Sequence, residues 1–508
     1  MSNQSNDKTI AKNTVMLYIR MLMSIVVSLY TSRVVLQTLG VKDFGIYGVV
    51  GGVVSMFSFL NGTMSGATSR FLMFEMGKGN FQKLRDSFVS AMTIHIGIAL
   101  AVFFLSETVG LWFLSNKLVI PEERMFAAHI VFQCSILGMF VTVTQVPYDS
   151  AIIAHERMDV YAYIELLNVF LRLGTVYLLL IGNFDKLILY AALNLSVNIV
   201  VAMTYRIYCL KHYEESHLRW GWHKDILKEM TSYSVYNLLG NFGYVFNQQG
   251  INFSLNMFFG VVLNAASSIA TTVSGVVQGF VSAVITAFRP PITKSYAQED
   301  YAGVERLFKL ALKTSIIINS LFTIPLLLEL DTVLQLWLGL VPEYTAVFCR
   351  IILISMVFNN IRYILIIGIQ AVGLVRDLSI VTGLLYAFNP FLVFICLKSG
   401  LRPEVAYLGD ILVNLLVIGW SSVLLRRYIA QINVVSILSS MIAPTCVFIG
   451  VLTMLYFGEQ YMKPSFLRIV ITTVCSSALL FLLTYTLILT RPQRAQVNDF
   501  VVKKIYWR

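Results

Sequence analysis

Amide side chains are concentrated in one apolar stretch, SVYNLLGNFGYVFNQQGINFSLNMFFG, which covers residues 234 to 260. On a helical wheel, one arc of about 80° holds the side chains of Asn237, Asn241, Tyr244, Gln248 and Asn252. A helix that faced lipid would leave these amides without the hydrogen bonds that water gives them. The pattern favours a hydrated cavity whose amides bind a hydroxyl-rich ligand.

The next apolar stretch, 261–288, repeats the pattern with smaller side chains. Gln278 shares one helical face with Asn264 and with several Ser and Thr residues. Two explanations are open: these faces line a cavity, or they pack helix against helix. We favour the cavity for the amide-rich stretch, whereas neither explanation is preferred for the second one.

Five arginines lie inside apolar stretches, namely Arg20, Arg33, Arg172, Arg350 and Arg362. A charge at the bilayer centre costs about 2.5 to 3.5 kcal/mol, so each needs a partner, water or a ligand. Guanidinium binds phosphate oxygens through paired hydrogen bonds, which makes these residues candidate sites for an anion. Arg20 continues a Ser and Thr stripe and is predicted to face a water-filled cavity. Arg33 lies about 220° further round the same helix, and it either packs against other helices or reaches the interface.

Two acids accompany these arginines. Glu165 lies two turns before Arg172 on the same face, a spacing that allows a partial or water-bridged pair. Asp410 has Asn414 four residues further on. Each acid is either a counter-ion for an arginine, which is the preferred interpretation, or a site of ion coupling such as a proton relay.

The sequence contains no pattern typical of an enzyme or a metal centre. The six cysteines occur singly, and there is no phosphate-binding loop. The Gly-rich run GVVGGVVSMFSFLNG lies in apolar sequence, which favours helix packing over nucleotide binding. Because the outer loops are also short, we predict that the protein is not an enzyme and has no cofactor, no metal and no catalytic residues.

These polar groups are carried by a strongly apolar chain. Its 508 residues are 57% hydrophobic and 13% charged, against the roughly 25% charged residues of soluble proteins. The apolar blocks are long enough to cross a hydrocarbon core of ~30 Å as helices. The predicted transmembrane helices are 13–38, 44–68, 87–114, 124–148, 159–182, 186–209, 229–258, 261–288, 307–330, 344–371, 377–397, 405–426, 434–458 and 466–490.

The basic residues predict the orientation of the chain. Most of the 38 Lys and Arg fall on one side of the predicted helices, which places both termini in the cytoplasm. The net charge of +11 then forms a basic inner rim that contacts anionic membrane lipids. This explanation needs no nucleic acid partner.

The two sides of a polar interruption at 210–228 resemble each other. LGVKDFGIYGVVGGV from Leu39 matches FGVVLNAASSIATTV from Phe259, which aligns Gly40 with Gly260. We therefore predict an all-α polytopic membrane protein with about fourteen transmembrane helices. Twelve of them form two pseudo-symmetric six-helix lobes, which are related by an axis along the membrane normal. The predicted parts are an N-lobe 1–209, an amphipathic cytoplasmic linker 210–228, a C-lobe 229–428, extra helices 13 and 14 in 429–490 and a basic cytoplasmic tail 491–508.

The run TSRVVLQTLGVKDFGIYGVVGG, followed by SRFLMFEMGKGNFQKL, resembles the polysaccharide or O-antigen flippases of the multidrug/oligosaccharidyl-lipid/polysaccharide (MOP) exporter superfamily. The resemblance extends over essentially the whole chain. It implies a two-lobed transporter of the bacterial cytoplasmic (inner) membrane that acts in lipopolysaccharide or polysaccharide biosynthesis. Its substrate would be a polyprenyl-diphosphate-linked oligosaccharide, moved from the inner to the outer leaflet by alternating access. Glycan polymerase or glycosyltransferase partners are also implied.

Other functions stay open. Cation-coupled multidrug exporters of the same superfamily have similar lobes, but they usually have twelve spans and carry essential carboxylates in the first, seventh or tenth. This chain has arginines and amides in those spans, which favours an anionic ligand. A membrane enzyme of glycan assembly would be expected to have a long outer loop with catalytic groups. A non-transporting scaffold for glycan assembly is a further alternative.

Overall fold

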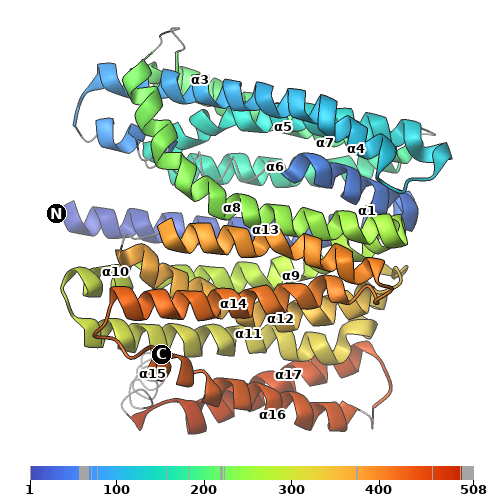
Figure 1. Ribbon diagram of the computed structural model, residues 1–508, viewed down its shortest axis with the longest axis vertical. Coiled ribbons are helices and arrows are strands. Elements are labelled where there is room, and N and C mark those ends of the chain that lie inside the picture. Colours follow the sequence, from blue (N-terminus) through green and yellow to red (C-terminus); the bar gives the residue numbers. More distant parts are fainter. Residues whose placement is uncertain are drawn as a thin grey trace. The chain divides into compact units, whose positions relative to one another are not determined.

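The computed structural model describes residues 2–56, 68, 69, 71–76, 78–155, 157–181, 184–217, 221, 223–372, 376–459, 462–491 and 494. Within these ranges, side chains are described except for residues 2–21, 232–240, 283, 286, 287, 290, 293, 294 and 297. All regular structure in the described ranges is helical, so the predicted all-α membrane class is confirmed (Figure 1).

The long helices follow one another along the chain with short connections. They are α1 (Ser2–Ser55), α3 (Phe81–Leu105), α5 (Met125–Ala154), α6 (Met158–Leu179), α7 (Lys186–His212), α8 (Lys224–Phe259), α9 (Val261–Ala287), α11 (Tyr301–Leu338), α12 (Thr345–Val372), α13 (Arg376–Lys398), α14 (Val405–Tyr428), α16 (Ile442–Glu459) and α17 (Phe466–Leu483). The shorter ones are η2 (Ser106–Gly110), α4 (Leu111–Asn116), η3 (Glu122–Arg124), η4 (Glu214–Ser216), α10 (Arg289–Ala297), α15 (Val434–Ser439) and η5 (Thr484–Ile488).

Twelve helices among the described residues are long and apolar enough to cross a membrane. The first of them, Leu22–Ser55, is divided at Gly40 and covers parts of two predicted helices, 13–38 and 44–68. The helix α8 covers the predicted span 229–258, but it is not one of the twelve because its many amide side chains lower its apolar content. The fourteen predicted spans are thus all represented by helical segments.

The chain forms two compact units. The first unit comprises residues 1–269, 342–345 and 379–409, and the second comprises 270–341, 346–378 and 410–508. In the first unit α5 packs against α3 and α7, and α6 packs against α1 and α7. The first unit therefore includes α8 and most of α13 in addition to the helices of the predicted N-lobe, and the predicted lobe boundaries stay a prediction.

In the second unit α16 and α17 pack against each other and against α11 (Figure 1). Buried aliphatic side chains of the three helices form one apolar cluster, which includes Ile324, Val451 and Leu480. A larger cluster, centred on Phe308, Leu353 and Ile364, joins α11 and α12. Burial of the side chains in the smaller cluster anchors α16 and α17, which belong to the predicted extra helices, to the second unit.

Glycines allow the second segment of α1 to approach α9 closely in the first unit. A Cβ atom on Gly45 would lie 2.0 Å from the carbonyl oxygen of Val261, and one on Gly48 would lie 2.6 Å from Ser268 Oγ. Both distances are shorter than any ordinary van der Waals contact. Within the described part of the Gly-rich run, Gly48 thus lies at a helix contact, whereas a Cβ atom on Gly51 would have no heavy atom within 4 Å.

We expect Gly45→Ala to lower the free energy of unfolding by about 1 to 3 kcal/mol, because its methyl group overpacks a backbone carbonyl that cannot rotate away. Gly51→Ala is the matched control on the same helix, since a Cβ there has no heavy atom within 4 Å. Alanine also favours a helix by up to about 1 kcal/mol over glycine. Thermal unfolding of both variants in detergent tests this, and equal losses in the two variants would contradict the packing argument.

The two glycines that the internal repeat aligns have the same backbone conformation. Gly40 has φ 76° and ψ 169°, and Gly260 has φ 74° and ψ −171°. This region of backbone space is accessible almost only to glycine. Each glycine is the single residue that separates two helical segments, so the sequence repeat corresponds to a repeated backbone feature.

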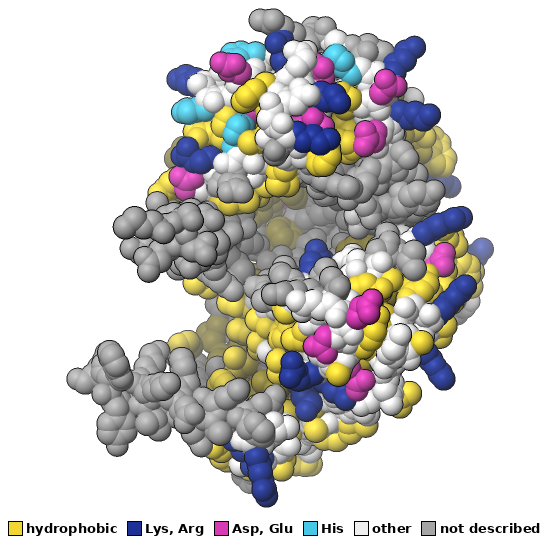
Figure 2. Space-filling model, turned by 90° about the vertical axis from the view of Figure 1, so that its left-hand side faces the viewer, with side chains coloured by type: hydrophobic (Ala, Val, Ile, Leu, Met, Phe, Trp, Pro, Cys, Tyr) yellow, Lys and Arg dark blue, Asp and Glu magenta, His cyan; other side chains and the backbone are white. Residues whose placement is uncertain are grey.

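Charged and histidine side chains gather at one end of the first unit, in the upper part of the face that Figure 2 shows. His155 Nε2 lies 2.6 Å from Glu215 Oε1, and the imidazole stacks on the ring of Tyr213. His223 Nε2 lies 3.4 Å from Asp86 Oδ1. Burial favours a higher pKa for Glu215, but the hydrogen bond with His155 outweighs it, together with a backbone hydrogen bond, and the pKa is lowered. These contacts hold η4 and the start of α8 against α5 and α3. Two tryptophans of the predicted linker, Trp220 and Trp222, lie outside the described residues.

Candidate functional site: an amide-held arginine and the polar faces of the helices

One arginine of the first unit is held, among the described residues, by amide side chains alone. Arg172 of α6 donates from Nε to Asn168 Oδ1 at 3.0 Å. Its terminal nitrogens lie 3.5 Å from Asn194 Oδ1 and 3.4 Å from Asn198 Oδ1. Within the described ranges, Arg172 forms no ion pair with a carboxylate. The guanidinium is thus positioned without being neutralised.

The helices α6 and α7 bring these amides together because four residues make about one helical turn. Asn168 lies one turn before Arg172, and Asn194 lies one turn before Asn198. The Asn194 side chain donates from Nδ2 to the carbonyl oxygen of Tyr190 at 2.9 Å, which leaves its Oδ1 for the guanidinium. The contacts from Arg172 to α7 are long and therefore weak. An anionic oxygen can replace them at small cost, and the exposed side chain is accessible to it.

The acid predicted to accompany Arg172 has a different partner. Glu165 Oε1 accepts a hydrogen bond from Tyr205 Oη of α7 at 3.2 Å, and no ion pair joins Glu165 to Arg172 among the described residues. The spacing along α6 therefore gives no direct ion pair among the described residues, and a water-bridged pair stays a prediction. Residues seven apart share a face of the helix, but the Tyr205 hydroxyl on the neighbouring helix is within hydrogen-bonding reach of the carboxylate. This tertiary contact outweighs the local spacing.

Two further polar groups of the first unit were not singled out from the sequence. Asp149 Oδ1 accepts from Gln145 Nε2 at 2.9 Å, one turn earlier on α5. Arg206 of α7 donates to Thr144 Oγ1 at 2.8 Å and lies 5.9 Å from the ring of Tyr148. Asp149 and Arg206 both lie near the ends of predicted spans, where charged residues are ordinary. Nothing in the sequence therefore distinguished them from residues at a membrane interface.

The amide stripe of α8 is accessible along part of its length. Asn241 and Gln248 are exposed and Asn252 is half-buried, whereas the side chain of Asn237 lies outside the described residues. On other faces of α8, Asn256 is fully buried: it accepts from the backbone N–H of Val119 at 2.8 Å and donates to Asn264 Oδ1 at 2.9 Å. The accessible part of the stripe agrees with the lining of a cavity. The buried amides beside it, in contrast, pack helix against helix.

The candidate residues of the second unit form short polar chains. Gln278 donates to Asn360 at 3.4 Å, and Asn360 donates to Asn319 at the same distance. Arg362 donates to Asn359 Oδ1 from Nε at 3.2 Å and from a terminal nitrogen at 2.5 Å. The Arg362 guanidinium, like that of Arg172, is thus bonded to an amide.

Arg350 and Asp410 have different surroundings from Arg362. Arg350 forms an ion pair of 2.5 Å with Asp331, and the Asp331 side chain is 70% exposed. Asp410 accepts on its backbone oxygen from Asn414 at 2.9 Å. The charge of Arg350 is therefore already compensated, which makes it a weaker candidate than Arg362 for binding an anion.

The two candidate arginines of α1 are placed unequally. The side chain of Arg20 lies outside the described residues. Arg33 is exposed and forms no ion pair within the described part of the chain. On the same segment of α1, Ser24 and Ser28 are also exposed, so this segment presents several accessible polar side chains.

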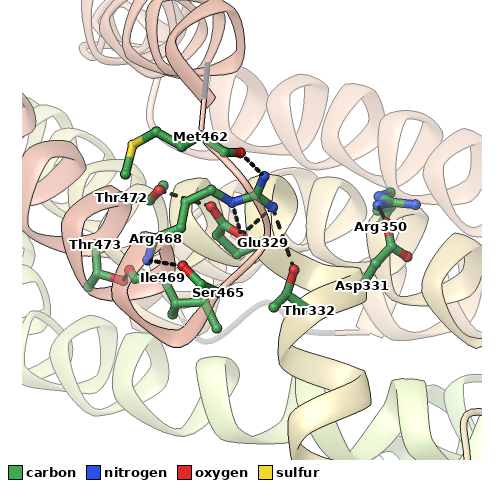
Figure 3. Close-up of polar contacts among 10 residues, drawn as sticks. All are labelled: Glu329, Asp331, Thr332, Arg350, Met462, Ser465, Arg468, Ile469, Thr472 and Thr473. Atoms are coloured by element: carbon green, nitrogen blue, oxygen red, sulfur yellow. Dashed lines mark hydrogen bonds and ion pairs between the residues drawn. The ribbon is translucent and has the colours of Figure 1, made fainter. Parts of the chain in front are cut away.

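A buried ion pair joins α11 to α17 in the second unit (Figure 3). Arg468 donates to Glu329 Oε2 at 3.0 Å from Nε and at 2.8 Å from a terminal nitrogen. Thr472 donates to the other carboxylate oxygen at 3.0 Å, and Arg468 also donates to the carbonyl oxygen of Met462 at 3.1 Å. The Glu329 side chain is fully buried and that of Arg468 is 12% exposed. Because every charge is paired, this cluster is a structural clamp rather than a ligand site.

Comparisons with known proteins identify the fold. No family model and no curated protein matches the sequence. Among solved structures, the lipid II flippase MurJ in an inward closed conformation aligns with a TM-score of 0.65 at 12% identity, over 93% of this chain and 98% of MurJ. An inward-facing multidrug resistance MATE family transporter aligns with a TM-score of 0.59 at 14% identity, over 83% of this chain and 100% of that chain.

A further similar structure is distinguished by its binding pocket. It is a MOP superfamily transporter from Pyrococcus furiosus, described by the reverse polarity of its binding pocket, and it aligns with a TM-score of 0.58 at 15% identity over 82% of this chain and 96% of that chain. Identities this low establish the fold and no finer relationship. Sequence, helices and structural matches together lead to one conclusion: this chain has the fold of the transporters of the MOP superfamily.

Proposed function

We propose that the protein is a flippase that moves a polyprenyl-diphosphate-linked oligosaccharide from the inner to the outer leaflet of a bacterial cytoplasmic membrane. In this proposal two lobes alternate in exposing a central site to the two sides of the membrane. Both termini lie in the cytoplasm, and glycan polymerases or glycosyltransferases are its partners in glycan assembly.

The observation that carries the proposal is the environment of Arg172. A guanidinium that is bonded to three amides and to no described carboxylate keeps its full charge for a ligand. Diphosphate must bring negative charge through the membrane, and arginine matches phosphate oxygens in both charge and shape. A cationic drug would be repelled at the same place.

The exposed polar side chains fit the remainder of such a substrate. Asn241 and Gln248 of α8 are able to donate and accept hydrogen bonds, as recognition of sugar hydroxyls requires. Arg20, Arg33 and Arg362 are further proposed contacts for the diphosphate, and Asn237, Asn252 and Gln278 are proposed contacts for the sugars. Arg350 belongs to the proposed set only if its ion pair with Asp331 opens.

The extent of the structural matches agrees with a flippase fold that includes extra helices. MurJ covers 93% of this chain and the MATE transporter covers 83%, a difference of 10 percentage points, or about 50 of the 508 residues. Two membrane helices with their connections have about this length.

A cation-coupled exporter is the second candidate, because one observation favours it. Glu165 places a carboxylate in a membrane-spanning helix of the first unit and Asp149 places one near the end of another, and neither forms an ion pair with a described residue. Carboxylates in that position are typical of sites that bind protons or cations. The same acids, together with Asp410, would also serve a flippase that uses an ion gradient.

Direct measurement of lipid movement tests the proposal. The purified protein is reconstituted in vesicles that contain a polyprenyl diphosphate bearing a short fluorescent oligosaccharide, and a membrane-impermeant quencher is then added. We expect the inner-leaflet signal to become quenched with time in protein vesicles and to persist in empty vesicles. A fluorescent phosphatidylcholine serves as a control lipid that should not move.

Two results would overturn the proposal. One is an unchanged inner-leaflet signal for the glycolipid under sodium and proton gradients of either direction. The other is gradient-driven export of a fluorescent organic cation without any movement of the glycolipid, which would identify the cation exporter instead.

A further inference from the structure

An apolar cavity of about 450 Å³ lies within the first unit. It is bounded by the second segment of α1, by η2 and α4, by α8 and by α13. Its floor consists of buried residues such as Val53, Phe253 and Ser254. Its mouth is formed by Val109 and Phe391, whose side chains are 60% and 57% exposed. The cavity thus opens through apolar side chains on membrane-spanning helices.

The lining excludes a polar occupant. Among the described lining residues none carries a charge, and Ser254 supplies the single side-chain hydroxyl. A sugar or a diphosphate placed there would lose its hydrogen bonds to water without replacement. Met56 and Met257, which also line the cavity, have flexible thioether side chains that adapt to irregular apolar shapes. The chemistry therefore selects a hydrocarbon.

The length of the cavity matches one leaflet of a bilayer. Along α8 the lining runs from Phe246 to Met257, which corresponds to about 16 Å at the helical rise of 1.5 Å per residue. Half of a ~30 Å hydrocarbon core is about 15 Å. A single extended chain that enters from the bilayer would thus lie alongside α8 over the depth of its own leaflet.

The volume separates a fatty acyl chain from a long polyprenyl chain. An apolar protein cavity of about 150 Å³ accommodates benzene, with its six carbon atoms, so about 450 Å³ accommodates about eighteen. This is the size of one acyl chain of an ordinary phospholipid. A polyprenyl tail several times longer does not fit.

We propose that this cavity binds one acyl chain of a bilayer phospholipid. The bound chain lies against α4, α8 and α13. Beside it α8 and α13 meet directly, because a Cβ atom on Gly250 would lie 2.5 Å from Pro390 Cβ. The lipid therefore acts as a packing element of the first unit, at a site separate from Arg172. The inference does not depend on which substrate is transported.

Native mass spectrometry of the delipidated full-length protein, titrated with dioleoyl phosphatidylglycerol, tests the proposal. We expect one phospholipid to bind saturably. Val109→Trp places an indole across the mouth, and the loss of contact with only two methylene groups weakens binding about tenfold. The matched control is Val200→Trp on α7, because Val200 is 46% exposed and does not line the cavity. Its affinity for the phospholipid should equal that of the wild type.

A second measurement locates the chain without altering the mouth. The photoreactive residue p-benzoyl-L-phenylalanine, introduced in place of Met257, should form a crosslink to the acyl chain of the bound phospholipid. Undecaprenyl phosphate at equal concentration should not reduce this crosslink.

Several results would overturn the proposal. The first is that no phospholipid binds saturably. The second is that the folded Val109→Trp and Val200→Trp variants bind the phospholipid with equal affinity. The third is that undecaprenyl phosphate reduces the crosslink. The last result would assign the cavity to a polyprenyl chain. Glycolipid movement in vesicles is not the readout here, so the proposed function can fail or stand independently.

Discussion

Arg172→Ala is expected to slow glycolipid flipping by about 100-fold, because it removes a charge whose loss from a hydrogen-bonded pair costs 2 to 5 kcal/mol. The protein should still fold, since the Arg172 side chain is exposed and its amide partners on α7 are also bonded elsewhere in part. Flipping rates in reconstituted vesicles, measured at equal protein content, test the expectation.

Three companion variants separate charge from shape. Arg172→Lys keeps the charge but loses the paired hydrogen bonds, so an intermediate rate is expected. Asn198→Asp leaves the arginine in place and gives it a carboxylate partner 3.4 Å away, which should inhibit as strongly as its removal. Arg402→Ala, in an exposed loop, is the control and should have the wild-type rate. Wild-type rates in both Arg172→Ala and Asn198→Asp would contradict the assignment of this site.

Glu329→Ala is expected to lower the stability of the protein by about 3 to 5 kcal/mol, because it leaves the charge of Arg468 buried without a partner. Thermal unfolding in detergent measures the effect. Asp331→Ala is the matched control: its ion pair with Arg350 lies two residues further along α11 but is exposed (Figure 3). An exposed pair contributes about 0 to 1 kcal/mol, so this variant should unfold close to the wild type.

The double variant Glu329→Leu with Arg468→Met checks the cause. Replacing both members of a buried pair by apolar side chains of similar size is often neutral, so most of the lost stability should return. If the double variant is as unstable as Glu329→Ala, the loss stems from packing and not from an uncompensated charge. Equal losses in Glu329→Ala and Asp331→Ala would contradict the role of burial.

The helices were largely predictable because membrane spans depend on local properties. Length and apolar content determine whether a segment can cross the hydrocarbon core, and both are visible in the sequence. The boundary between the first two predicted spans was placed at 38 to 44, and the structure divides α1 at Gly40. The same reasoning found α8, although its amides make it the least apolar of the predicted helices.

The partners of the polar side chains were not predictable to the same degree. The spacing along α6 places Glu165 on the same face as Arg172. Two partners of Arg172 and the partner of Glu165 nevertheless lie on α7, some 20 to 40 residues further along the chain. Glu329 lies inside a predicted span and Arg468 begins another, and nothing in either segment indicates the other. Which side chain meets which depends on how helices pack, and that information is distributed over many apolar contacts.

The glycines at 40 and 260 leave the chain with very short joints. One residue separates α8 from α9, and one separates the two segments of α1. A rotation of either helix against its successor must therefore be absorbed by two torsion angles, with no slack from a loop. Each joint behaves as a pivot that couples the tilt of one helix to that of the next, and the matching conformations of Gly40 and Gly260 place the same kind of pivot at two points of the chain.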